Sequence, residues 1–211
     1  MSTPNSPTQS PVAELCHSIE TSFKSTSLGP DSWYLLTIAC LSGSPDPELA
    51  KDLYLYVIQK EKNSTSAARQ AFIRRIRETL VKCVSMVWCC KPIEARIAIS
   101  QVEQEEDRDY SLTREYWQCD QANDERGMRW YRAICTRDEK STLGLFDAHR
   151  GFHIMIENLR KKTHWHIGGT RRTGVSKEDT QVLWECIQRV ARIFDLKMNK
   201  VPAVDAVEYD V

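Results

Sequence analysis

The spacing of apolar residues is the feature that most constrains the fold of this chain. Between residues 66 and 88, large apolar side chains recur every three or four positions, which is the period of an α-helix with one buried face. A similar period returns between residues 182 and 194 and in most other segments. No stretch alternates apolar and polar residues between hairpin turns, as a half-buried strand would. The sequence therefore predicts an all-α fold, a single-domain helical bundle.

Breaks in this period divide the chain into separate helices. The charged run EQEEDRDY, residues 103–110, carries no apolar stripe and is expected to be solvated. Gly127 is expected to weaken a helix in the region that follows. We predict helices at residues 12–23, 33–41, 47–60, 66–88, 92–102 and 177–194, with one or two more between residues 101 and 140.

The stretch THWHIGGTRRTGVSKED, residues 163–179, is predicted to join two helices. Gly168 and Gly169 are expected to end the first helix, because glycine is common just past helix ends. Ser176, followed three residues later by Asp179, resembles a capping box that starts the second helix. Asp179 is therefore predicted to have a structural role and not a catalytic one.

Length and composition favour one domain. With 211 residues, of which 41% are hydrophobic, the chain can bury one sizeable core. Residues 1–11 are polar and contain several prolines, so they are expected to form a disordered tail. The domain is predicted to span residues 12–198, and residues 199–211 are expected to be an irregular C-terminal tail.

The charges and the apolar runs argue against a membrane or nucleic acid as a partner. Lys plus Arg and Asp plus Glu each number 29, so no net charge attracts polyanions. The first residues lack the apolar centre of a secretory signal. The best candidate for a membrane span, residues 33–41, is less than half of the roughly 20 residues that cross a bilayer. We expect a cytoplasmic protein.

The cysteines and histidines favour neither a redox site nor a metal site. The eight cysteines contain no C-x-x-C pair, and most lie in apolar runs, so we expect reduced and mostly buried thiols. His164 and His166 are two residues apart, which places them on opposite sides of a helix. His149 and His153 share a helical spacing, but two ligands are too few. We therefore expect no metal and no cofactor.

Two stretches together resemble the carboxymuconolactone decarboxylase-like superfamily, which includes the alkylhydroperoxidase D-like proteins. The first is WHIGGTRRTGVSKED, residues 165–179, with the amphipathic helix that follows it. The second, RIRETLVKCVSMVWCCKPIEARIAI, residues 75–99, is similar to the family's Arg-Glu helix and Gly-x-Pro turn in the form seen in fungal members. The likeness covers about residues 30–198. It implies an all-helical, commonly oligomeric fold, and the family includes cofactor-free decarboxylases and thiol peroxidases.

Two departures from the family pattern limit what the resemblance implies. The peroxidase branch uses a C-x-x-C, which is absent here, so thiol peroxidase activity is not expected. Fungal members also have a longer helical region between segments similar to DAHRGF and IMIENLRKKTHWH, which here meet at Phe152 and His153. This shortening fits a repurposed pocket, an inactive paralogue or an error in the gene model.

The resemblance assigns catalytic roles to two residues. His166 matches the family's histidine and is predicted to transfer a proton, since imidazole titrates near neutral pH. Glu78 matches the glutamate of the Arg-Glu motif and is predicted to be its partner acid or base. Each has a structural alternative. His166 could close a helix end, and Glu78 could pair with a nearby arginine or lysine.

Four further residues are predicted to bind the substrate. Arg171 and Arg172 have guanidinium groups suited to a substrate carboxylate. Trp165 and Trp88 are expected to wall an apolar pocket. The run GGTRR lacks the strand-to-helix context of a phosphate loop, so a nucleotide is not indicated.

These assignments predict a cofactor-independent enzyme of fungal secondary-metabolite biosynthesis. Its substrate would be an organic-acid, polyketide- or terpenoid-like small molecule, and its reaction a decarboxylation, a dehydration or a cyclisation, including a pericyclic one. Other copies of the chain are the expected protein partners. The alternative is a non-catalytic oligomeric scaffold or binding protein, which the shortened segment before Ile154 favours.

Overall fold

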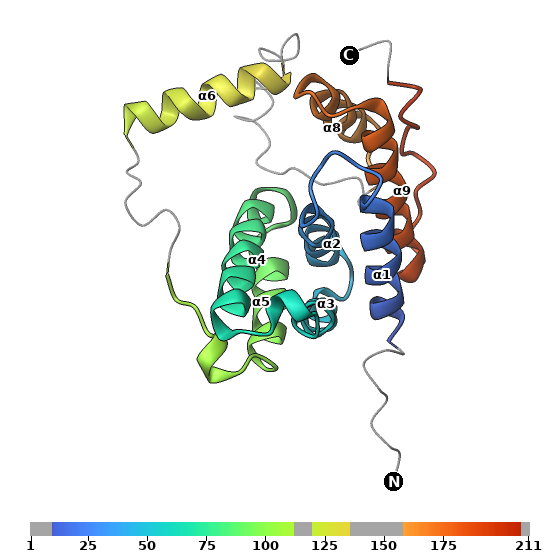
Figure 1. Cartoon of the computed structure of the whole chain (residues 1–211). Coiled ribbons are helices and arrows are strands. Elements are labelled where there is room, and N and C mark those ends of the chain that lie inside the picture. Colours follow the sequence, from blue (N-terminus) through green and yellow to red (C-terminus); the bar gives the residue numbers. More distant parts are fainter. Residues whose placement is uncertain (1–9, 112–119, 136–157, 208–211) are drawn as a thin grey trace.

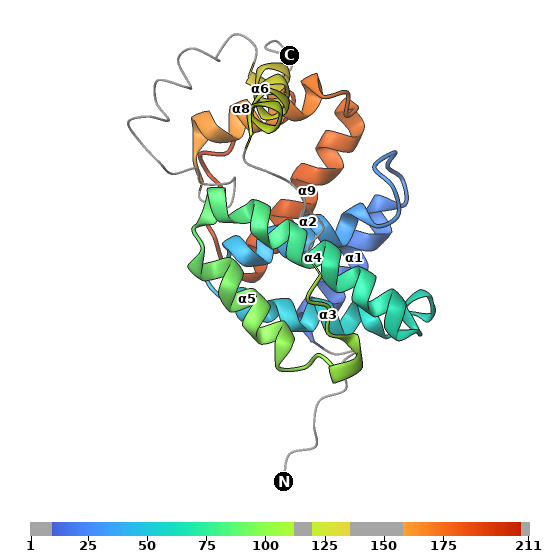
Figure 2. The ribbon, with the colours of Figure 1, turned by 90° about the vertical axis from the view of Figure 1, so that its left-hand side faces the viewer.

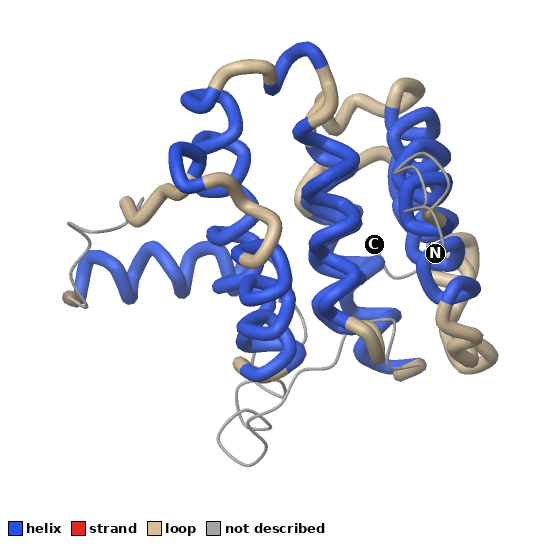
Figure 3. Tube along the Cα trace, turned by 90° about the horizontal axis from the view of Figure 1, so that it is seen from below, coloured by secondary structure: helices blue, strands red, loops and turns tan. Residues whose placement is uncertain are grey.

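The computed structural model describes residues 10–111, 120–135 and 158–207, and these residues form an all-α structure (Figure 1). Figure 3 shows helices joined by loops, with no strand in the described ranges. The predicted fold class is thereby confirmed. The tail before residue 10 and the junction at Phe152 and His153 lie outside the described residues.

The described residues form eight α-helices and three short 3₁₀ turns. The helices are α1 (Pro11–Phe23), α2 (Ser32–Gly43), α3 (Ala50–Ile58), α4 (Ser66–Val87), α5 (Cys90–Ser100), α6 (Gln121–Cys135), α8 (Arg160–Arg172) and α9 (Lys177–Ile193). The 3₁₀ turns are η2 (Pro47–Leu49), η3 (Glu61–Asn63) and η4 (Glu105–Asp107).

Helix α2 lies at the centre of the core. It packs against α1, α3, α4, α5 and α9, and its residues Trp33, Ile38 and Leu41 are fully buried. Phe72 of α4 extends this core, because its ring lies edge-on to Tyr34 of α2 at 5.0 Å. The continuous apolar run predicted to be a buried helix therefore has neighbours on all sides.

The predicted cap at Ser176 is present, but only one half of the capping box forms. Ser176 Oγ accepts a hydrogen bond from the backbone N–H of Asp179 at 3.0 Å, which starts α9. The Asp179 carboxylate does not turn back to Ser176. It accepts hydrogen bonds from the backbone N–H and the hydroxyl of Ser27, at 3.1 and 2.5 Å, in the loop between α1 and α2. Asp179 thus ties α9 to this loop, which agrees with the structural role predicted for it.

The glycine pair does not end α8, and that prediction was wrong. Gly168 and Gly169 are buried inside the helix, which continues to Arg172. Gly174 follows with a φ of +93°, a conformation that favours glycine because it has no Cβ. Gly168 instead permits close packing, since a Cβ there would lie 3.1 Å from the guanidinium of Arg172.

The acidic run predicted to be solvated is only partly solvated, because three of its carboxylates are buried while Glu105 and Glu106 are exposed. Glu103, Asp107 and Asp109 keep only 7%, 1% and 7% of their surface exposed. We call residues 103–111 the acidic strap, because they lie along the arginines of α4 and α5. A buried carboxylate requires such partners. The pairs are Arg69 Nε–Asp107 Oδ2 at 2.6 Å, Arg96 Nη2–Glu103 Oε2 at 2.9 Å, Arg77 Nη2–Asp109 Oδ1 at 3.5 Å, and Arg74–Asp109.

The segment after α9 forms no helix, yet it is packed against the protein. Val204 and Val207 are buried with Ile167 of α8 and Trp184 of α9. The indole N–H of Trp184 donates to the carbonyl of Pro202 at 3.0 Å. This segment therefore holds α8 and α9 together, and so fixes the position of α8.

We expect Arg69→Met to lower the free energy of unfolding by about 3 kcal/mol, because it leaves the Asp107 carboxylate buried without its ion-pair partner. The matched control is Arg75→Met, also on α4, whose pair with Asp31 at 2.8 Å is exposed on both sides. That loss should be below about 1 kcal/mol. Urea denaturation measures both values. Equal losses would contradict the conclusion that the strap is a buried ion-pair element.

Asp109 should make stability depend on pH in the acid range. Burial alone would raise its pKa, but hydrogen bonds from Ser111 and Arg74 lower the pKa of Asp109 to about 2, from an ordinary value of 3.8. Its stabilisation is therefore present above pH 3.8 and is lost as the pH falls towards 2. Urea midpoints should fall more steeply over this range in the native chain than in Asp109→Asn. Identical pH profiles would show that Asp109 is not responsible.

Candidate functional site

Helix α8 carries four of the six predicted site residues. Thr163, Ile167 and Gly168 face the protein and are buried. Trp165 is half-buried and His166 is exposed. The predicted histidine thus lies on the solvent side of a helix whose other side is fixed by α9 and the C-terminal segment.

His166 has an electrostatic environment suited to a base. Lys162 lies one helical turn before it, and the Lys162 ammonium stands 4.8 Å from the ring centre of Trp165. Although His166 is exposed, desolvation by nearby protein atoms and the charge of Lys162 lower its pKa below the ordinary 6.5. The imidazole is therefore mainly neutral at neutral pH and can accept a proton.

The two predicted anion-binding arginines have structural contacts at the end of α8. Arg171 Nη1 donates to the carbonyl of Val175 at 2.5 Å, in the turn that leads to α9. The Arg172 guanidinium lies against Gly168. Both arginines are half-buried. Cations at the C-terminal end of a helix are also favoured by the helix dipole. Both arginines lie within two helical turns of His166 on the same helix.

The other two predicted residues lie on α4 and at its end. Glu78 is half-buried in the middle of α4. Trp88 follows the last residue of α4, and 63% of its surface is exposed. Its backbone has a φ of 67° and a ψ of 163°, a combination rare outside glycine. Trp88 therefore lies at the surface of the end of α4.

The structure brings the α8 residues together but does not pack Glu78 beside them. Helix α8 packs against α6 and α9, whereas α4 packs mainly against α2 and α5. Figures 1 and 2 show α8 and α4 as separate parts of the fold. The geometry therefore supports a group made of Lys162, Trp165 and His166, which we call the α8 group. Glu78 lies on a different helix and is not part of it.

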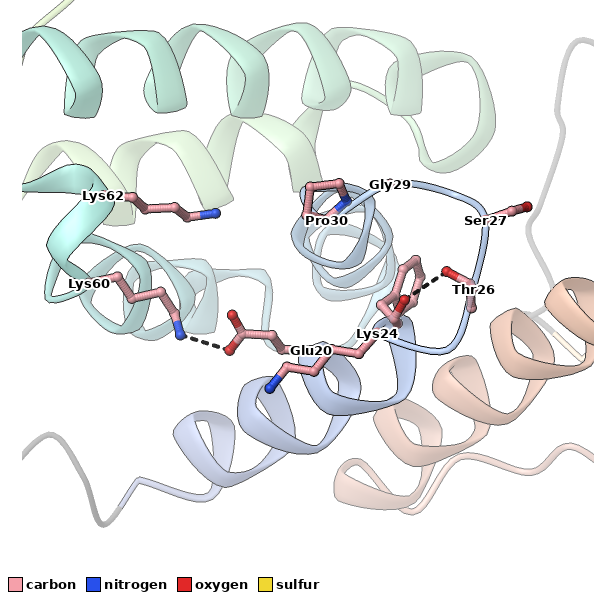
Figure 4. A pocket seen from close by; sticks show the side chains of 9 residues that line it. Glu20, Lys24, Thr26, Ser27, Gly29, Pro30, Lys60 and Lys62 are labelled. Carbon is pink, nitrogen blue, oxygen red and sulfur yellow. Dashed lines mark hydrogen bonds and ion pairs between the residues drawn. The ribbon is translucent and has the colours of Figure 1, made fainter.

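A cleft that the sequence did not indicate lies between the end of α1, the loop after it and the end of α3 (Figure 4). Its volume is about 450 Å³, within the usual range for small ligands. Three lysines and one glutamate contribute to its lining. From the sequence, the loop after α1 could be predicted only as a break between helices. Nothing in the local pattern shows that Lys24 lies near Lys60 and Lys62 in the fold. The lining residues are Glu20, Phe23, Lys24, Thr26, Ser27, Gly29, Pro30, Lys60 and Lys62.

The charges of this cleft are largely paired within the protein. Glu20 accepts hydrogen bonds from Lys60 Nζ at 2.7 Å and from the Tyr56 hydroxyl at 2.9 Å. Burial alone would raise its pKa, but these bonds lower the pKa of Glu20. Lys62 Nζ pairs with Asp31 at 2.7 Å. Two of the three ammonium groups thus already hold a carboxylate, so the cleft is a weaker candidate for an anion site than its lysines suggest.

Six cysteines of the described ranges are free thiols. Cys16, Cys40, Cys83 and Cys186 are buried, as predicted for most of them. Burial raises the pKa of the Cys16 and Cys40 thiols to about 12, which disfavours the reactive thiolate. The adjacent Cys89 and Cys90 are exposed at the start of α5.

Comparisons with known proteins return no similar protein: no family model, no curated protein and no solved structure matches this chain. Within the described ranges, no three His, Cys, Asp or Glu side chains gather in a way that could hold a metal ion. A search of the same residues finds no helix that is both long and apolar enough to cross a membrane.

Titration of the histidine by NMR tests the environment of the α8 group. We expect His166 to titrate below 6.5, and Lys162→Met to raise its pKa, because a neighbouring positive charge is removed. Lys161→Met is the matched control, since Lys161 is exposed on the same helix and is not a cause of the shift. An unchanged His166 pKa in Lys162→Met would rule out Lys162 as the source of the lowered value.

Proposed function

We propose that this protein is a cofactor-independent enzyme of fungal secondary-metabolite biosynthesis. It acts on an organic-acid, polyketide- or terpenoid-like small molecule by decarboxylation, dehydration or cyclisation. The observation that carries the proposal is the lowered pKa of His166 beside Lys162 and Trp165. A neutral imidazole next to an ammonium group is suited to removing a proton while an anion forms nearby.

Each residue of the α8 group has a role in this proposal. His166 accepts the proton, and the Lys162 charge stabilises the enolate or carboxylate that results. Trp165 offers a flat apolar surface for the carbon skeleton of the substrate. Arg171 and Arg172 orient a substrate carboxylate at the end of the same helix. Glu78 acts as the partner acid or base only for a substrate long enough to extend from α8 towards α4.

The test is metabolite profiling of the source organism after deletion of the gene. An intermediate should accumulate in the deletion strain, and the native gene should clear it. His166→Ala should fail to do so, with turnover reduced about 100-fold or more, since proton transfer by a positioned side chain contributes that much. The matched control is His164→Ala, two residues away on the same helix, which should clear the intermediate. Restoration by His166→Ala would exclude His166 as the proton-transfer group.

A second candidate function is a non-catalytic oligomeric scaffold or binding protein. The observation that favours it is the separation of Glu78 from His166, because α4 packs mainly against α2 and α5 whereas α8 packs mainly against α6 and α9. In this case the deletion strain accumulates no intermediate, or every histidine variant restores its profile equally.

A further inference from the structure

The carboxylates of two ion pairs in the acidic strap each use only one of their oxygens. Asp107 Oδ2 accepts a hydrogen bond from Arg69 Nε at 2.6 Å, and Glu103 Oε2 accepts one from Arg96 Nη2 at 2.9 Å. Their second oxygens, Asp107 Oδ1 and Glu103 Oε1, are buried and accept no hydrogen bond from the described residues. A buried carboxylate oxygen costs free energy unless a donor reaches it. The strap therefore contains two buried acceptors that require donors.

Two buried donors without an acceptor lie on the helices beside the strap. They are the Tyr54 hydroxyl of α3 and Arg96 Nη1 of α5, and neither atom makes a hydrogen bond within the described ranges. Helices α3 and α5 pack against each other (Figure 2). Burial and the charges of Asp107 and Glu103 raise the pKa of Tyr54 to about 12. Its hydroxyl therefore keeps its proton at neutral pH and can donate a hydrogen bond.

The four atoms lie in one region of the protein. The charges of both ion pairs act on the Tyr54 hydroxyl, so this hydroxyl lies close to both of them. In the described ranges, six buried side-chain atoms lack a hydrogen-bond partner, and four of the six are these. We call the side chains of Tyr54, Arg96, Glu103 and Asp107 the polar cluster. Native proteins contain few unpartnered buried polar groups, so four in one region indicate a bound molecule that bonds to them.

The charges of the polar cluster disfavour an ion as the bound molecule. Its two carboxylates are already balanced by the guanidinium groups of Arg69 and Arg96. A cation would leave the donors of Tyr54 and Arg96 unpartnered, and an anion would leave the two carboxylate oxygens unpartnered. A water molecule donates two hydrogen bonds and accepts two, which matches the two acceptors and two donors of the cluster. The four atoms are closed off from bulk solvent, so the bound molecule must also be small.

We propose that the polar cluster binds one internal water molecule. This water accepts hydrogen bonds from the Tyr54 hydroxyl and Arg96 Nη1, and it donates to Glu103 Oε1 and Asp107 Oδ1. It thereby joins α3 and α5 to the acidic strap, in addition to the direct ion pairs. The inference is independent of the proposed enzymatic function, because no residue of the polar cluster belongs to the α8 group.

A crystal structure of the full native chain tests the site directly. One water should lie within about 3.2 Å of at least three of the four atoms, since buried waters typically make about three hydrogen bonds. In crystals grown with rubidium in place of sodium, the same position should give no anomalous signal, because the bound molecule is neutral.

The rate at which this water exchanges with the solvent is a second measurement. Oxygen-17 relaxation dispersion detects internal water molecules that exchange slowly. Tyr54→Phe removes one donor and keeps the buried ring, so the water should exchange about three to ten times faster, as expected for the loss of one hydrogen bond. The matched control is Tyr34→Phe on α2. Tyr34 is also buried but lies outside the polar cluster, so this variant should leave the rate unchanged.

Three outcomes would overturn the proposal. One is a native crystal structure with no water in the polar cluster, as when the Tyr54 hydroxyl bonds directly to Glu103 or Asp107. Another is a rubidium signal at the site, which would assign it to a monovalent cation. The third is an equal change of the water exchange rate in Tyr54→Phe and Tyr34→Phe.

Discussion

The burial of α2 is the constraint on which the rest of this structure depends, since eight of its twelve residues are buried and the other four are half-buried. A helix with apolar residues on every side cannot lie at a surface, so other helices must surround it. Two of its buried hydroxyls bond within the helix: Thr37 donates to the carbonyl of Trp33 and Ser42 to that of Ala39, each at 2.8 Å. The neighbours need only one apolar face each. That is why α1, α4 and α9 are amphipathic while α2 is not.

Two segments without α-helix then fix the outer helices. The acidic strap forms ion pairs with arginines of α4 and α5. These ion pairs replace the water that would otherwise solvate the buried carboxylates. The C-terminal segment places Val204 and Val207 under α8. In both cases, side chains from a segment outside the α-helices contact the face of a helix that no other α-helix covers. The position of the α8 group therefore depends on a segment that has no regular structure itself.

Much of the fold could be predicted from the sequence because helical periodicity is a local property. The bounds of α4 and α9 follow from it within a few residues. The acidic strap could not be predicted, since a run of carboxylates looks the same whether its partners are water or arginines 30 to 40 residues away, as Asp107 and Arg69 are. Gly168 was misinterpreted for a related reason, because the tight contact that it permits with Arg172 is not visible in the local sequence. Trp165 and His166 were predicted together because they are neighbours in the sequence, whereas Lys162, one helical turn before His166, was not predicted as a site residue. The separation of Glu78 from His166 could not be predicted, because it depends on how α4 and α8 are placed in the tertiary fold.

The exposure of His166 also bears on which substrate the proposed enzyme would use. Desolvation of His166 by protein atoms is only partial, because its side chain is still exposed, and exclusion of the remaining water would strengthen every electrostatic contact at the site. The α8 group contains one large apolar side chain, Trp165, and it is only half-buried. A small carboxylic acid bound there would leave His166 and Lys162 hydrated. A bulky polycyclic skeleton that stacks on Trp165 would cover both side chains and exclude the water itself. Within the proposed function, a polyketide- or terpenoid-like substrate would therefore suit the α8 group better than a simple organic acid.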